Sequence, residues 1–294
     1  MTEPAWIRLD AGDAAWPAGW RDLDDAPDAV LVTGRPEVLA QPALAIVGTR
    51  RATPRGLAVA RRLAGELAAG GWTIASGLAL GIDGEAHRGA LETGGTTVAV
   101  MATGPDRTYP TQHRQLRERI EQAGCAVTET PAGGGAGGRW LFPRRNRLIA
   151  ALASGVIVVE APRQSGALVT AHLAADLGRT VWAVPGPVDA PESEGCHDLL
   201  RDGALLCAGA ADIAPVLPPP LGVAALPPRA VPVAGSAARW ILDRLDLDGV
   251  DQADLLDRWP GTAAMWHEGL LALELAGLIR RLPGGRLAPR IWHS

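Results

Sequence analysis

The sequence predicts an α/β fold in which a doubly wound, mostly parallel sheet is followed by a second, smaller domain. Two observations lead to this prediction. Short apolar runs alternate with helical segments between residues 43 and 186, and these runs are apolar throughout rather than at every second residue. Such strands are typical of a parallel sheet that is covered by helices on both faces. A proline-rich stretch then precedes a last helical segment that ends in a hairpin.

The first 42 residues are rich in Trp, Asp and Pro and show little periodicity. We interpret them as an irregular N-terminal arm that holds a short strand at 29–34. The regular part begins at 43–48, an apolar run that ends at Gly48. Thr53 and Pro54 have the residue types of a helix N-cap and first turn, and the helix that they start ends at Gly70.

The same alternation continues along the chain. Further strands are predicted at 72–76, 96–103, 125–130, 156–161 and 180–186. Further helices are predicted at 83–94, 112–124, 144–153 and 166–178. We therefore expect residues 43–214 to form one domain around a parallel sheet.

The C-terminal part begins with residues 215–236, which contain seven prolines and indicate a semi-rigid linker. Three predicted helices and a hairpin with Gly284 and Gly285 at its turn are typical of a winged helix, which we place at 237–294. This segment has seven arginines and eight acidic residues. A DNA-reading helix should be basic, so we interpret the domain as a protein-interaction or dimer-supporting module.

Composition excludes several classes of function. The net charge is −4, and all 28 basic residues are Arg. Without Lys, neither a P-loop nor a Schiff-base enzyme is possible. The first residues lack the pattern of a leader, and no apolar run of about 18 residues occurs, so we expect a cytoplasmic protein that does not enter a membrane. Positive charge is local: residues 50–62 hold five arginines and 139–147 hold four, both without an acid.

Metal and cofactor sites are not expected. The three cysteines are far apart and suit a reduced interior: Cys125, Cys196 and Cys207. Asp83, Glu85 and His87 have the residue types of metal ligands, but the spacing shows no complete set. Glu160 ends a strand like the acid of a Walker B motif, although a chain without Lys has no Walker A partner for it.

Candidate ligand-binding residues gather where the predicted strands end, the edge at which doubly wound folds bind ligands. Glycines follow several strands: Gly48, Gly77, Gly81, Gly104 and Gly186. Arg50 follows the first strand, and "LFPRRNR" (141–147) places arginines at the start of a helix. The planar guanidinium bonds phosphate through two N–H groups. Tyr109 and Phe142 offer flat surfaces for unstacked bases, and core packing is the alternative for Phe142.

Seven motifs together resemble the DNA-processing protein A (DprA/Smf) family. They are "AIVGTR" (45–50), "SGLALGIDGEAH" (76–87), "GPDRTYP" (104–110), "FPRRNRLIA" (142–150), "SGALVTA" (165–171), "VPGPV" (184–188) and "DLLRDGA" (198–204). The resemblance covers about residues 43–212, and "LLALELAGLIRRLPGG" (270–285) is similar to the family's C-terminal winged helix. It implies a Rossmann-like domain in a non-enzymatic protein that binds single-stranded DNA, protects it during natural transformation and loads RecA recombinase. It also implies a homodimer.

The resemblance places these residues at or around a pocket for strand phosphates: Arg50, Gly77, Gly104, Tyr109, Arg144, Asn146, Arg147, Ser165, Gly166 and Thr170. Phe142 joins them as an aromatic anchor, and Arg114 replaces the basic residue that follows the family's "YP" motif. Arg50 is expected to contact DNA directly, and Asn146 to brace backbone. The chain departs from the family at Leu80, where Arg is common, and at His113 and His197, where Asn is common.

Two other functions remain open. One is an enzyme of the same architecture, such as a phosphoribohydrolase acting on nucleotides, although "PAGGGAGG" lacks the Thr and the acid of that class. The other is a nucleotide sensor with the winged helix as its output. Release of ribose phosphate would favour the first, and tight binding of mononucleotides the second.

Overall fold

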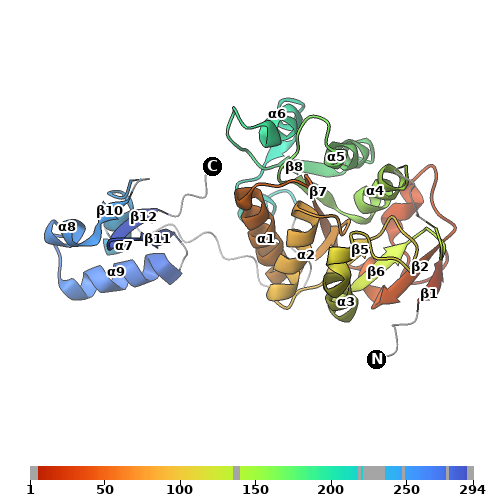
Figure 1. Ribbon diagram of the computed structural model, residues 1–294, viewed down its shortest axis with the longest axis horizontal. Helices are drawn as coiled ribbons and strands as arrows, with labels where there is room; N and C mark the ends of the chain where they lie inside the picture. The colour runs from red at the N-terminus through yellow and green to blue at the C-terminus, as the bar shows by residue number, and fades with distance from the viewer. Residues whose placement is uncertain are drawn as a thin grey trace. The chain divides into compact units, whose positions relative to one another are not determined.

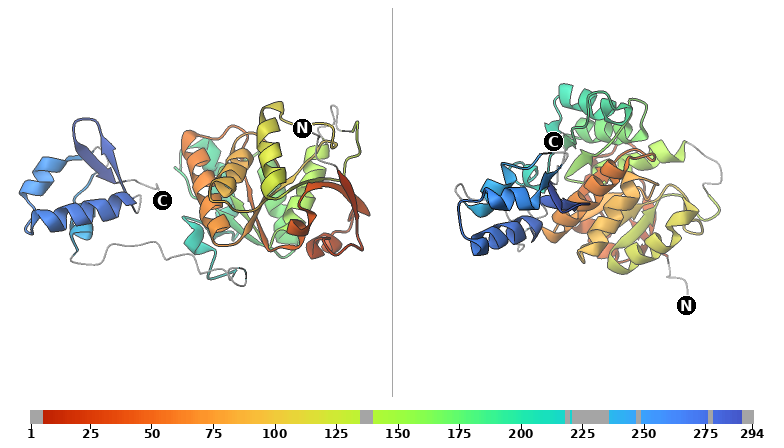
Figure 2. Two further views of the ribbon diagram at one scale, coloured as in Figure 1. Left: turned by 90° about the horizontal axis from the view of Figure 1, so that it is seen from below. Right: turned by 60° about the vertical axis from the view of Figure 1, so that its left-hand side comes forward.

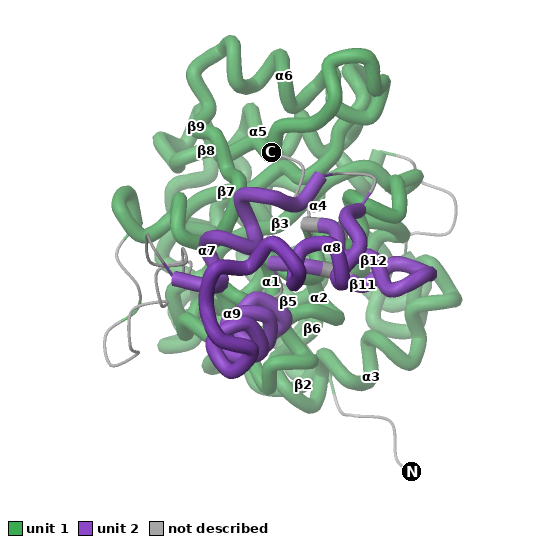
Figure 3. Tube along the Cα trace, turned by 90° about the vertical axis from the view of Figure 1, so that its left-hand side faces the viewer, with its two compact units in different colours: residues 1–226 green, residues 227–294 purple. Residues whose placement is uncertain are grey.

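The computed structural model describes residues 6–134, 140–217, 220, 236–246, 249–275 and 278–289. The chain divides into two compact units, residues 1–226 and 227–294 (Figure 3). Most of the predicted linker at 215–236, and residues 135–139 of the glycine-rich loop, lie outside the described residues.

The first unit is built on one large sheet (Figure 1). Its described strands are β1 (Ile7–Asp10), β2 (Ala29–Gly34), β3 (Ala43–Val47), β4 (Thr73–Ser76), β5 (Thr97–Val100), β6 (Cys125–Thr128), β7 (Gly155–Val158), β8 (Thr180–Ala183) and β9 (Leu205–Leu206), in the order β1-β2-β6-β5-β4-β3-β7-β8-β9. From β6 to β9 every neighbouring pair is parallel. Among these described strands, the two antiparallel pairs are β1 with β2 and β2 with β6. The predicted mostly parallel, doubly wound α/β sheet is confirmed.

Helices cover both faces of this sheet (Figure 2). They are α1 (Pro54–Ala69), α2 (Ile82–Glu92), α3 (Arg114–Ala123), α4 (Leu141–Leu152), α5 (Gly166–Asp176) and α6 (Glu194–Arg201), with short 3₁₀ helices at Ala18–Asp22, Pro36–Ala40, Thr111–His113, Pro191–Ser193 and Ala210–Asp212. In β3, Ala43, Ala45 and Val47 pack toward α4 and α5, whereas Leu44 and Ile46 pack toward α1 and α2. A strand buried on both faces has no polar side, which is why its sequence is apolar throughout.

The strand predicted at 29–34 is confirmed as β2, but the described residues 6–42 do not form an irregular arm apart from the sheet. β1 and β2 extend the main sheet, because β2 pairs with β6. Trp16 and Trp20 are buried in the same cluster as α4, and the Trp20 indole N–H donates to the Leu148 carbonyl at 2.9 Å. The two tryptophans stand in a segment that shows no regular apolar period, so their burial could not be predicted from spacing.

The second unit has the elements that the predicted winged helix requires. They are α7 (Ala237–Leu242), β10 (Val250–Asp251), α8 (Gln252–Asp257), α9 (Ala263–Leu275), β11 (Ile279–Leu282) and β12 (Arg286–Pro289). The strands form a sheet in the order β10-β12-β11, and Gly284 and Gly285 have positive φ in the turn between the last two. Trp240, Trp259 and Trp266 pack against one another in its core. The assignment to the winged-helix class stays a prediction.

The cysteine thiols are free and buried within the described residues. Burial raises the pKa of each to about 12, so they remain protonated at neutral pH. Among the described helices, none combines the length and the apolar character needed to cross a bilayer.

His87 is a buried, neutral histidine between α2 and β5. Its Nδ1 lies 2.7 Å from the Thr97 hydroxyl oxygen, and that hydroxyl donates to the Ile74 carbonyl at 2.6 Å. Because the hydroxyl proton is used there, Nδ1–H of His87 must be the donor to Thr97. Burial, with smaller contributions from His113 and Arg145, lowers the pKa of His87 to about 3.

Replacing His87 by asparagine should reveal this titration. The amide keeps a donor near the position of Nδ1 but binds no proton. With a folded pKa of about 3 and an unfolded value of 6.5, the wild type loses stability as the pH falls below the unfolded value, because only the unfolded chain then binds the proton. We expect His87→Asn to be less stable at about pH 7.5, and the difference to narrow by about 1.4 kcal/mol at about pH 5.5. Urea unfolding at the two pH values measures it, and an unchanged difference would contradict the assignment.

Candidate functional site

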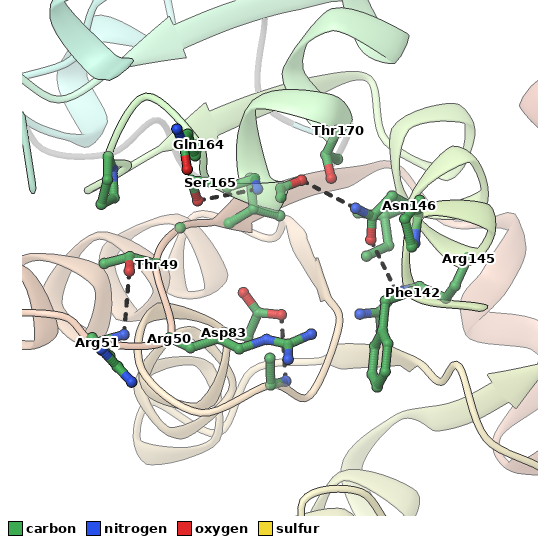
Figure 4. A pocket seen from close by; sticks show the side chains of 18 residues that line it. Thr49, Arg50, Arg51, Asp83, Phe142, Arg145, Asn146, Gln164, Ser165 and Thr170 are labelled. Carbon is green, nitrogen blue, oxygen red and sulfur yellow. Dashed lines mark hydrogen bonds between the residues drawn. The ribbon is translucent and has the colours of Figure 1, made fainter. Parts of the chain in front are cut away.

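A cavity of about 430 Å³ opens at the carboxyl ends of β3 and β7 (Figure 4). The chain runs outward from β3 to β6 on one side and from β7 to β9 on the other, so the cavity lies at the point where the strand order reverses. Open α/β sheets bind ligands at this point. Its walls are Val47, Gly48, Thr49, Arg50, Arg51, Ala79, Asp83, Phe142, Pro143, Arg145, Asn146, Ile149, Pro162, Gln164, Ser165, Gly166, Ala167 and Thr170.

The loop after β3 carries two exposed arginines, Arg50 and Arg51. The guanidinium carbon of Arg50 lies 4.6 Å from the centre of the Phe142 ring, which holds the side chain at the cavity. Close packing shapes the loop: a Cβ at Gly48 would lie 2.5 Å from the Ile82 side chain. Glycine at that position lets β3 approach α2 so closely that the arginines emerge at the cavity mouth.

Arg145 supplies a buried positive charge in the wall of the cavity. Only 4% of it is exposed. Its guanidinium donates to the carbonyls of Gly77 and Val100, and its Nε donates to the Asn146 side chain at 3.2 Å. Burial lowers the pKa of Arg145 to about 10, which leaves it protonated at neutral pH. Since these three acceptors are uncharged, an anion in the cavity would be stabilised by this charge.

Asp83 is the one acidic side chain among the described residues that line the cavity. It accepts hydrogen bonds from the backbone N–H groups of Gly77 and Ala79, at 3.1 and 3.4 Å. Burial raises the pKa of Asp83, and the guanidinium of Arg145 opposes that rise. Three arginines and one carboxyl group line the cavity, so positive charge is in excess there and favours an anion.

The N-terminus of α5 forms the opposite wall. The Ser165 side chain caps this helix by accepting from the Ala167 N–H at 3.3 Å. Asn146 donates from its amide to the Gly166 carbonyl at 3.2 Å, which is the bracing of backbone that the sequence predicted. A Cβ at Gly166 would meet no atom within 4 Å, so backbone there is open to a ligand. A helix N-terminus also favours negative charge.

Six of the predicted site residues come together in the cavity: Arg50, Phe142, Asn146, Ser165, Gly166 and Thr170. Tyr109 is half exposed, and its ring centre lies 5.4 Å from that of Phe142. Gly77 supports the site from behind, since a Cβ on it would lie 2.5 Å from the Arg145 guanidinium.

Two predicted residues lie away from the cavity walls. The Gly104 N–H donates to the Gly134 carbonyl at 3.2 Å. Arg114 lines a second cavity, of about 400 Å³, together with Trp6 and Arg117. Gly104 begins the loop 104–113 and Arg114 comes directly after it, so neither residue lies at the carboxyl ends of β3 and β7.

The role predicted for Arg147 as a phosphate contact requires correction. Its side chain is buried and forms ion pairs with Glu129 and with Asp25, the latter at 2.8 Å. Arg144 is exposed and lies 3.4 Å from the same Glu129. Helical spacing explains the division: positions 144 and 147 share one face of α4, while Phe142, Arg145 and Ile149 share the face toward the cavity. The helix also starts earlier than predicted, at Leu141.

Replacing Arg147 by methionine should therefore affect stability and not ligand binding. Glu129 would lose its buried partner, which costs about 1–3 kcal/mol of unfolding free energy. Arg144→Met removes an exposed partner of the same acid and should cost less than about 1 kcal/mol. Urea unfolding of both variants measures the contrast. A stable Arg147→Met protein with impaired DNA binding would restore the original prediction.

Four charged or amide side chains line the cavity but were not among the assigned site residues: Arg51, Asp83, Arg145 and Gln164. Arg145 belongs to the arginines of "LFPRRNR" that the sequence placed at this edge. The spacing of Arg145 from Phe142 and Ile149, at i−3 and i+4, was a signal for that residue. Asp83 was considered in the sequence as a residue of metal-ligand type, and its hydrogen bonds to the preceding turn depend on the tertiary fold. Nothing in the local pattern distinguishes Gln164.

The acids weighed as metal or nucleotide ligands have structural partners. Glu160 accepts from the backbone N–H and the hydroxyl of Thr53, at 2.9 and 2.6 Å, and so holds the start of α1. Glu85 pairs with Arg61 and Arg88. Within the described part of the chain, no group of three or more His, Cys, Asp or Glu side chains is placed to hold a metal ion.

Comparison with known proteins identifies the family. Residues 8–218 match the model of DNA recombination-mediator protein A. The chain is 44% identical over 248 residues to a putative DNA processing protein DprA of Mycobacterium tuberculosis, covering 83% of this chain and 64% of that protein. It is 38% identical over 208 residues to the DNA processing protein DprA of Streptococcus pneumoniae, covering 68% and 71%. The chain thus spans less than two thirds of its mycobacterial relative.

Two solved structures share the fold. The X-ray structure of DprA from Streptococcus pneumoniae matches with a TM-score of 0.69 and 35% identity, over 72% of this chain and 74% of that one. DNA processing protein A from Helicobacter pylori, whose structure describes its single-stranded DNA binding mode, matches with a TM-score of 0.65 and 30% identity, over 72% and 94%. The chain therefore belongs to the DNA recombination-mediator protein A family, which includes proteins named DprA and Smf.

Proposed function

We propose that the cavity at the ends of β3 and β7 binds the sugar-phosphate backbone of single-stranded DNA without regard to sequence. The observation that carries this proposal is the convergence of Arg50, Arg51 and Arg145 on one cavity with a single acidic side chain among its described walls. Phosphate contacts fix a strand in place but carry no sequence information. This suits a protein that receives DNA of any sequence.

The aromatic pair beside the cavity supports the proposed preference for single strands. Tyr109 is half exposed and packs on Phe142, which in turn packs on Arg50. An unpaired base can stack on such a ring, whereas the faces of bases in a duplex are already covered. The protein of Helicobacter pylori is described as binding single-stranded DNA, and this chain matches 94% of it.

The wider role rests on the family resemblance. In this proposal the chain protects incoming DNA during natural transformation, delivers it to RecA recombinase and acts as a homodimer. The residues of α9 that are exposed include Met265, His267, Glu268 and Leu271 but no arginine within the described part of that helix. This surface supports a protein-interaction role for the second unit rather than reading of duplex DNA.

The proposal includes no catalysis. Asp83, the acid within the cavity, is engaged by two backbone N–H groups, and Glu160 is engaged by Thr53. A nucleotide-hydrolysing enzyme needs an acid or base that reaches its substrate. Asp83 holds the turn after β4 and Glu160 holds the start of α1, which supports binding as the function of the site.

Fluorescence anisotropy of labelled oligo-dT and of a matched duplex, in a salt series, tests the proposal. We expect tighter binding of the single strand, with a log–log salt slope of about −0.7 for each phosphate contacted. Equal affinity for both DNA forms, or none for either, would refute it. Ribose phosphate released from mononucleotides would favour the enzyme, and tight mononucleotide binding without release would favour the sensor.

A further inference from the structure

The turn between β4 and α2 contains a backbone conformation that is unfavourable for its residue. Leu78 has a φ of 59°, and it is the one non-glycine residue with positive φ among the described residues. A bulky side chain in this left-handed region is strained and persists only where its surroundings hold it. The turn therefore depends on contacts from outside itself.

Three contacts hold Leu78 in place. Its side chain is buried in a cluster with Met101, Leu116 and Ile120. Asp83 binds the N–H groups on either side of it, those of Gly77 and Ala79. The third contact comes from a different element.

His113 makes that third contact. Its Nδ1 lies 2.9 Å from the Leu78 carbonyl oxygen. A carbonyl can only accept, so Nδ1 carries the proton. Burial lowers the pKa of His113, which keeps the ring neutral at physiological pH. His113 ends the 3₁₀ helix Thr111–His113, four residues after Tyr109, and only 3% of it is exposed.

The same turn forms part of the cavity. Ala79 and Asp83 line it, and Asp83 is labelled in Figure 4. The Gly77 carbonyl accepts from the Arg145 guanidinium. A rotation of the peptide unit at Leu78 would displace these groups together. Any residue that fixes the Leu78 carbonyl therefore fixes the wall that positions Arg145.

We propose that His113 is a positioning residue for the DNA-backbone cavity, acting through the Leu78 carbonyl on the turn that carries Asp83 and supports Arg145. It lies outside the cavity walls and touches no ligand there. It also joins two parts of the site, because the segment that carries Tyr109 is tied through His113 to the wall beneath Arg145. This inference rests on the proposed binding of single-stranded DNA.

Two substitutions separate the hydrogen bond from the bulk of the ring. The amide nitrogen of asparagine reaches the position of Nδ1, whereas that of glutamine reaches the position of Nε2. His113→Asn therefore keeps a donor to the Leu78 carbonyl, and His113→Gln loses it. We expect His113→Gln to bind oligo-dT about fivefold more weakly, the factor expected for the loss of one hydrogen bond, and His113→Asn to stay within about twofold of the wild type.

Hydrogen–deuterium exchange in the free protein gives a readout that does not depend on DNA. We expect faster exchange at Gly77 and Ala79 in His113→Gln and protection near that of the wild type in His113→Asn. Unchanged exchange in both variants, or equal loss of protection in both, would overturn the inference. If the wild type itself fails to bind single-stranded DNA, the proposed function fails, while the exchange result still decides whether His113 holds the turn.

Discussion

Replacing Arg50 by alanine is expected to weaken the binding of single-stranded DNA about tenfold to a hundredfold, the range of one charge-assisted hydrogen bond. Arg50 is exposed at the cavity mouth, and its guanidinium packs on Phe142 rather than on an acid. Its five donors are therefore held in place and ready for a phosphate. The log–log salt slope of the binding constant should fall in magnitude by about 0.7 for the phosphate contact that is lost.

Two variants control this measurement. Arg8→Ala removes an arginine that is also exposed and lies on β1, where it pairs with Asp10. The affinity for single-stranded DNA should stay unchanged if it depends on the cavity and not on the net charge of the protein. Arg50→Lys keeps the charge but lacks the planar fork, so it should lie between the wild type and Arg50→Ala. An Arg50→Ala protein with the affinity and salt slope of the wild type would show that DNA binds elsewhere.

Replacing Trp20 by alanine is expected to lower the free energy of unfolding by about 3–5 kcal/mol, the usual range for a large aromatic in a core. Trp20 is fully buried, contacts Trp16 edge to face at 5.1 Å between ring centres, and donates to the Leu148 carbonyl. That carbonyl belongs to α4, which carries Phe142 and Arg145. The N-terminal segment thus supports the helix that forms one wall of the cavity.

A matched pair makes the test specific. Trp140 is 62% exposed, and Trp140→Ala should change the unfolding free energy by less than about 0.5 kcal/mol, as is usual for surface positions. Trp20→Phe keeps an aromatic ring but loses the N–H donor, so it should fall between Trp20→Ala and the wild type. Urea unfolding followed by circular dichroism measures all three. A Trp20→Ala protein as stable as the wild type would mean that residues 6–42 are a dispensable arm after all.

The central sheet could be predicted because strands that are buried on both faces are apolar at every position. β3 and β7 are apolar runs that end at the ligand-binding edge. The helices that follow them, α1 and α5, begin with the capping residues Thr53 and Ser165. The N-terminal strands could not be predicted in the same way. Their contribution to the core depends on Trp16 and Trp20 reaching α4, a contact between residues more than a hundred positions apart.

A site residue could be predicted where its position after a strand alone places it at the cavity. Arg50 follows a strand directly, and so its place at the cavity follows from topology. The sequence could not show which arginines of "LFPRRNR" face the cavity and which pair with an acid. Arg147 faces Glu129, a partner from the end of β6, whereas Arg145 faces carbonyls and the cavity. The strain at Leu78 and its bond to His113 have no sequence signal at all.

Hydrogen–deuterium exchange of the wild type with and without oligo-dT tests the central claim most directly, because it locates the bound strand. Backbone N–H groups covered by a ligand exchange more slowly, and each segment of the chain is followed separately. We predict slower exchange in residues 48–52 and 164–168, the loop after β3 and the start of α5 that wall the cavity. Protection confined to residues 236–289, with these two segments unchanged, would contradict the proposal that the cavity holds the DNA backbone.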